Sequence, residues 1–134
     1  MNVLLVIVSS LISGTLGVFI STIYYKKSER RKEKVALIKQ LFGNRYDLNG
    51  DRFSEALNSI VIVFHDSRPV INRLKIFYDL VSDNISVQGP AKVENALIDL
   101  FKALVKDVKL DTEELNDNFM LSVFNTQQQI NINK

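Results

Sequence analysis

The first 25 residues of the chain carry no charged side chain, and this run limits what the rest can fold into. The segment from Val3 to Tyr25 contains only apolar residues, Gly, Ser, Thr and Tyr. As a helix it would be about 35 Å long, enough to cross a hydrocarbon core of about 30 Å. The run therefore predicts a transmembrane helix over residues 1–25.

The sequence KKSERRKEK follows the run directly and is strongly basic. Clustered Lys and Arg beside a span mark its cytoplasmic side, which predicts a single-pass protein with its N-terminus outside and the C-terminal domain in the cytoplasm. A cleaved signal peptide would carry its positive charge before the apolar core, where this chain has only Met1 and Asn2. The predicted membrane-interface residues are Tyr24, Tyr25, Lys26, Lys27, Arg30 and Arg31.

Small residues recur inside the predicted span. One row, four residues apart, contains Ser9, Ser13, Gly17 and Ser21, and a neighbouring row contains Ser10 and Gly14. Residues four apart share one face of a helix, and small side chains on one face let membrane helices approach closely. We interpret the two rows as a packing face between copies of the chain. The alternatives are a chance distribution and the lining of a pore, although a pore usually also shows charges or a hydrophobic gate.

The remainder predicts a small all-α domain of about four helices. The span should continue as one helix through a basic juxtamembrane segment and end at Gly43-Asn44. DLNGD (47–51) predicts a turn, SDNISVQG (82–89) a loop, and Pro90 a helix start. Apolar spacing of three and four predicts a helix from Phe53 through IVIVF, although that β-branched run also suits a strand. The predicted parts are residues 1–25 (transmembrane helix), 26–43 (juxtamembrane helix), 44–124 (cytoplasmic helical domain) and 125–134 (flexible polar tail).

Two later helices carry their own signals. Asp66 or Ser67 should cap a helix with Pro69 in its first turn and an apolar stripe at Val70, Leu74, Phe77 and Val81. Asp111 with Glu114 resembles a capping box for a last helix containing Leu115 and Phe119.

Residue types that commonly act in catalysis or bind metals are scarce in this sequence. The chain has no Cys and one His, His65, which excludes disulfides, thiolate chemistry and a multi-His metal site within one chain. His65 is interpreted as a helix C-terminal residue and Asn58 as a structural hydrogen-bonding residue. No phosphate-binding loop or pair of catalytic carboxylates is recognisable. The sequence therefore predicts a protein that is not an enzyme, with no cofactor and no bound metal.

Three segments carry a resemblance: RRKEKVALIKQLFGNR, ALNSIVIVF and LIDLFKALVKDVKLD. Together they make the chain similar to a family of small bacterial membrane-anchored proteins known only as a domain of unknown function. The resemblance implies one N-terminal span in the bacterial inner (plasma) membrane, basic residues after it and this order of helices. It implies no activity. The end FMLSVFN lacks the Tyr- and Pro-containing motif in which the family often ends.

Two functional hypotheses follow. The first is a non-enzymatic membrane protein whose cytoplasmic domain acts as an oligomeric scaffold or sensor module binding a protein partner or small ligand. The second is a membrane effector, for example in antiviral defence, that perturbs or permeabilises the inner membrane when a nucleotide second messenger binds. The expected partners are the lipid bilayer and further copies of the chain. Beside a membrane, the basic segment suits lipid better than nucleic acid.

Overall fold

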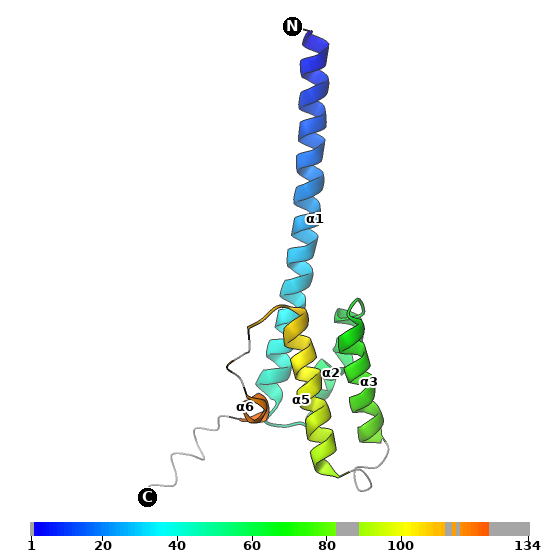
Figure 1. The fold of residues 1–134 in the computed structure, drawn as a ribbon, viewed down its shortest axis with the longest axis vertical. Helices are drawn as coiled ribbons and strands as arrows, with labels where there is room; N and C mark the ends of the chain where they lie inside the picture. The colour runs from blue at the N-terminus through cyan, green and yellow to red at the C-terminus, as the bar shows by residue number, and fades with distance from the viewer. Residues whose placement is uncertain (1, 83–88, 112–113, 115, 124–134) are drawn as a thin grey trace, which may run out of the picture. The chain divides into compact units, whose positions relative to one another are not determined.

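The computed structural model describes residues 2–82, 89–111, 114 and 116–123, and all regular structure within them is helical (Figure 1). The helices are α1 (Val3–Asn44), α2 (Asp51–Val63), α3 (Arg68–Ser82), α5 (Pro90–Asp107) and α6 (Asp117–Leu121). The predicted all-α class, with a long apolar helix followed by about four more, is confirmed. The IVIVF segment is helical because it continues the inward face of α2.

The chain divides into an N-terminal unit, Met1–Glu33, and a C-terminal unit, Lys34–Lys134. The described part of the N-terminal unit is one stretch of α1, whose apolar side chains are exposed; Leu4, for example, is 75% exposed. By length and composition, α1 can cross a membrane. The end of α1, from Lys34 to Asn44, belongs to the C-terminal unit.

The core of the C-terminal unit centres on α5. An amphipathic helix buries apolar residues at spacings of three and four, and α5 does so along its length. Phe101 belongs to α5, and the centroid of its ring lies 4.7 Å from that of the Phe42 ring on α1. On its other side α5 runs antiparallel to α3 (Figure 1). The core residues are Leu37, Ile38, Leu41, Phe53, Ala56, Ile60, Phe64, Val70, Leu97, Leu100, Phe101, Leu104, Val105, Val108 and Met120.

Local signals fix most helix ends. α1 ends at Asn44 as predicted, and the backbone N–H of Gly50 donates to the carbonyl of Asp47 in the predicted turn. Gly89 has φ +81°, a conformation that glycine adopts without steric cost, and Pro90 opens α5. α5 ends in a Schellman motif, in which Leu110 N–H donates to the carbonyl of Val105 at 3.0 Å.

The last helix differs from the prediction. α6 begins at Asp117, and its N-cap is Asn116, whose side-chain oxygen accepts from the N–H of Phe119 at 2.8 Å. The predicted capping box at Asp111 and Glu114 is therefore wrong, because a competing cap five residues further on starts the helix. Val81 also departs from its predicted stripe, since it is 41% exposed at the end of α3. Residues 83–88 of the predicted loop 82–89, Leu115 and the polar tail 125–134 lie outside the described residues.

Candidate functional site

The predicted packing face lies on the exposed surface of α1 in the N-terminal unit. All six of its residues are exposed. A side-chain carbon added at Gly14 or Gly17 would meet no atom within 4 Å beyond the helix's own backbone. Space therefore remains at both glycines, and their substitution disturbs no contact that the chain makes with itself.

Four hydroxyl groups on this part of α1 form hydrogen bonds inside the helix. Ser9, Ser10, Thr15 and Thr22 each donate a hydrogen bond to a backbone carbonyl about one turn earlier, at distances between 2.8 and 3.0 Å. A hydroxyl bonded in this way has no further donor to offer. These side chains are therefore compatible with a hydrocarbon environment, where an unpaired donor would be costly.

The predicted interface residues follow on the same helix. Tyr24 and Tyr25 are 76% and 65% exposed, and Lys26, Lys27, Arg30 and Arg31 are exposed as well. Further along, Lys32 forms an ion pair with Glu29 at 2.8 Å. An exposed aromatic and basic band thus directly follows the apolar part of α1.

A cluster of three charged residues lies in the C-terminal unit and was missed by the sequence analysis. The ammonium of Lys34, on α1, lies 2.8 Å from the carboxylate of Asp66 and 2.9 Å from that of Asp107. Its side chain is only 12% exposed, and Nζ lies 5.0 Å above the ring of buried Phe64. The cluster ties α1 to the turn after α2 and to the last residue of α5.

Two pKa values shift in this cluster. Burial alone would lower the pKa of Lys34, but hydrogen bonds and attraction to Asp66 and Asp107 outweigh it, so the pKa is raised. The hydrogen bond from Lys34 lowers the pKa of Asp66. The Asp66 contribution to stability is present above about pH 4 and is lost as the pH falls through the lowered folded value. The Lys34 contribution is present below about pH 10 and is lost as the pH rises through the raised folded value.

Replacement of Lys34 by Met tests this cluster. Met keeps an apolar stem over Phe64 but removes the ammonium, and we expect a loss of about 2 kcal/mol in the free energy of unfolding at pH 7. Urea unfolding of the full chain in mild detergent, followed by circular dichroism, measures it. Stability of the Lys34→Met variant should also fall less steeply below pH 4 than that of the wild type. If the free energy of unfolding fell equally steeply below pH 4 in the two proteins, the coupling of Lys34 to Asp66 would be contradicted.

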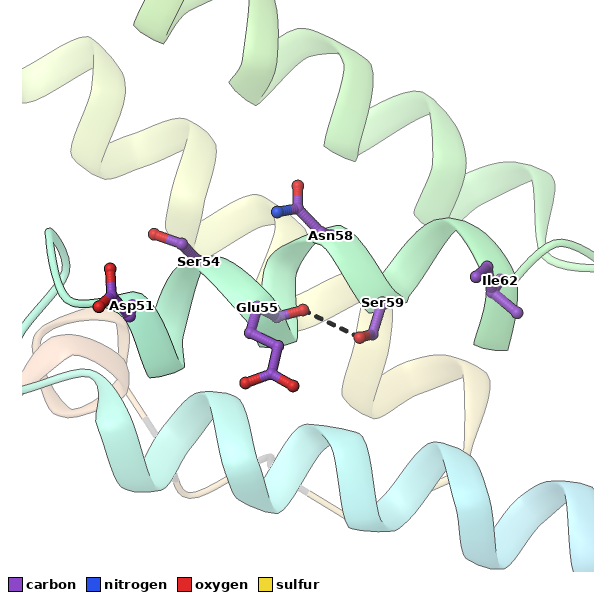
Figure 2. Close-up of a pocket in the computed structure, with 6 residues that line it drawn as sticks. All are labelled: Asp51, Ser54, Glu55, Asn58, Ser59 and Ile62. Atoms are coloured by element: carbon purple, nitrogen blue, oxygen red, sulfur yellow. Dashed lines mark hydrogen bonds between the residues drawn. The ribbon is translucent and has the colours of Figure 1, made fainter.

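An open hollow lies on the outward side of α2 (Figure 2). Its volume is about 450 Å³, and its lining residues all come from this helix: Asp51, Ser54, Glu55, Asn58, Ser59 and Ile62. Both hydroxyls are used locally, since Ser54 donates to the carbonyl of Gly50 and Ser59 to that of Glu55. Neither serine is therefore arranged as an activated nucleophile. Asn58 is exposed on this side of α2.

A second hollow of about 360 Å³ lies between α3 and α5. Its lining residues are Ser67, Pro69, Arg73, Asp99, Lys102, Ala103, Lys106 and Asp107. Four of its five charged side chains are held in ion pairs: Arg73 with Asp99 at 3.0 Å, Lys102 with Asp117, and Asp107 with Lys34. These side chains are therefore committed to partners within the C-terminal unit.

His65 lies at the C-terminal end of α2, as predicted. It is exposed, and its Nδ1–H donates to the carbonyl of Ile62 at 2.8 Å. Across the described ranges, no three His, Cys, Asp or Glu side chains gather in a group that could hold a metal ion. The features that stand out are thus the exposed face and basic band of α1 and the Lys34 cluster.

A family model described as a family of unknown function, DUF6680, matches residues 1–129, which include all the helices described above. No curated protein and no solved structure matches the chain.

Proposed function

The chain belongs to the DUF6680 family, and we propose that this member is a non-enzymatic, single-pass protein of the bacterial inner membrane. In this proposal the N-terminus lies outside, and the C-terminal unit is an oligomeric scaffold or sensor module in the cytoplasm that binds a protein partner or small ligand.

The exposed apolar surface of α1 carries this proposal. The most apolar window of the helix has a mean hydropathy of 2.5, and none of it is buried. Large apolar residues are exposed along it, among them Leu5 at 67% and Phe19 at 66%. Leaving such side chains in water costs roughly 1.5–3 kcal/mol each, which favours their insertion into an external apolar phase. A bilayer supplies that phase, and the basic band after Tyr25 supports the proposed orientation.

Self-association is supported by the two small-residue rows. Within hydrocarbon, helices associate through close packing, because lipid is as apolar as their side chains. Gly14 and Gly17 leave the backbone accessible on the proposed face, with no atom of another part of the chain beside them. Copies of α1 that meet on this face can approach backbone to backbone.

Replacement of both Gly14 and Gly17 by Leu tests the assembly. Because neither position contacts another part of the chain, the helix should remain intact while close approach between copies is blocked. Native mass spectrometry in mild detergent should show an oligomer for the wild type and mainly monomer for this variant. A shift of at least about tenfold in the dissociation constant corresponds to about 1.4 kcal/mol of lost packing.

Two controls make the result specific. Ala at the same two positions keeps the face small and should retain most of the assembly. Val8→Leu adds bulk on the opposite side of the helix, at a position that is 49% exposed, and should leave the oligomer unchanged. A wild-type monomer, or an oligomer that persists in the Leu variant, would refute self-association through this face.

A further inference from the structure

The basic band of α1 is concentrated on one side of the helix. Lys26 and Arg30 are four residues apart, as are Lys27 and Arg31, and all four are exposed. At 3.6 residues per turn these two adjacent rows cover an arc of about 140°. We define these four residues as the cationic face. The positive-inside rule depends on the number of Lys and Arg near a span and not on which side of the helix they occupy. Orientation of the span alone therefore does not account for their concentration on one side.

The two acidic residues of this segment lie beside the cationic face and not within it. At the same helical repeat, Glu29 and Glu33 fall outside the arc, along one edge. Glu29 forms an ion pair with Lys32 at 2.8 Å, and Lys32 lies on the side of the helix opposite the cationic face. Within the part of the chain that the structure describes, Lys26, Lys27 and Arg30 form no ion pair.

The position of the cationic face points to its partner. Tyr24 and Tyr25 immediately precede it and are aromatic residues of the kind that sit at the level of lipid headgroups. Four cations placed directly after an apolar helix meet the phosphate layer of the leaflet into which that helix inserts.

From these observations we propose that the cationic face selectively binds anionic phospholipid headgroups, so that the protein gathers acidic lipid on one side of its own span. This inference rests on the proposed membrane insertion of α1. It goes further in assigning a lipid class and four named residues. Each cation near an anionic surface contributes about fivefold in affinity, and the contribution falls within a Debye length as salt is added.

Lipid selectivity of the full chain provides the test. The protein is reconstituted from detergent into vesicles of phosphatidylcholine with a minor fraction of phosphatidylglycerol, and lipids retained after mild extraction are counted by native mass spectrometry. We expect the wild type to retain phosphatidylglycerol about fivefold or more above its bulk ratio, and less at high salt. The variant with Gln at all four positions should retain lipids at about the bulk ratio.

Two control variants test whether the location and the charge of these side chains matter. Lys32→Gln combined with Lys39→Gln removes two exposed charges elsewhere on α1 and should keep the enrichment. Exchanging Lys for Arg and Arg for Lys at the four positions keeps all the charges and should also keep it. Enrichment that survives the four Gln substitutions, or that is lost in the Lys32 and Lys39 control, would overturn the proposal.

Two further outcomes are distinguishable. If the wild type and all variants fail to float with vesicles, membrane insertion itself is wrong, and the proposed function fails with it. If all of them float but the wild type shows no lipid enrichment, only the lipid selectivity of the face is wrong. Binding of a short DNA duplex that persists at physiological salt and is lost with the four Gln substitutions would assign the face to nucleic acid instead.

Discussion

Replacement of Phe101 by Ala is expected to lower the free energy of unfolding of the C-terminal unit by about 3–5 kcal/mol. The Phe101 side chain is fully buried and lies against the ring of Phe42, so its removal takes away apolar burial and leaves a cavity at the centre of the core. A small domain has only about 5–15 kcal/mol of stability in total. This one change should therefore leave the unit close to its unfolding midpoint under mild stress.

Hydrogen exchange of the α5 amides in the full chain measures this loss directly, because α5 supplies the largest share of the core. Tyr78→Ala serves as the matched aromatic control, since the side chain of Tyr78 is 68% exposed on α3. It should cost less than about 1 kcal/mol. Similar losses in the two variants would contradict a core organised around Phe101.

Arginine at both Leu11 and Leu16 is expected to abolish stable membrane insertion. Each replacement exchanges a residue that favours the bilayer centre by about 0.5 kcal/mol for one that opposes it by about 3 kcal/mol. Together they cost about 7 kcal/mol, which is roughly five orders of magnitude in partitioning. In carbonate extraction of isolated membranes, the wild type should stay with the membranes and this variant should be released.

Met at the same two positions keeps the segment apolar and should leave the protein in the membrane fraction. Leu110→Arg places one such charge on the surface of the C-terminal unit, where Leu110 is 40% exposed, and should not change the fractionation. A wild-type protein that carbonate releases would remove the basis for anchoring, whatever the variants do.

Features encoded by neighbouring residues were predictable from the sequence. Gly43-Asn44 ends α1 and Pro90 begins α5, because both signals act on backbone geometry within a few residues. The buried residues of α2 and α5 follow the three- and four-residue spacing of their apolar side chains. Two residues could cap the last helix, Asp111 and Asn116, and they are only five positions apart. The structure uses Asn116, and the helix that starts there buries Met120, which is 2% exposed.

The Lys34 cluster was not predictable in the same way. Asp66 and Asp107 lie 32 and 73 residues from Lys34 in the sequence, and no periodicity relates them. Lys34 belongs to a run of cations that all look alike in the sequence. Only the fold separates it from Lys26 and Lys27, by turning its ammonium toward two carboxylates and the ring of Phe64.

The internal hydrogen bonds of Ser9 and Ser10, two residues of the proposed packing face, have a consequence for how copies of α1 would stay together. Because both hydroxyls already donate to their own backbone, helices that meet at these two residues gain surface contact and few new hydrogen bonds there. Such an association has a small free energy, so the fraction of assembled copies depends on their concentration. The number of copies per area of membrane would then set the assembled fraction, and a change in expression level alone would switch the protein between its single and assembled forms.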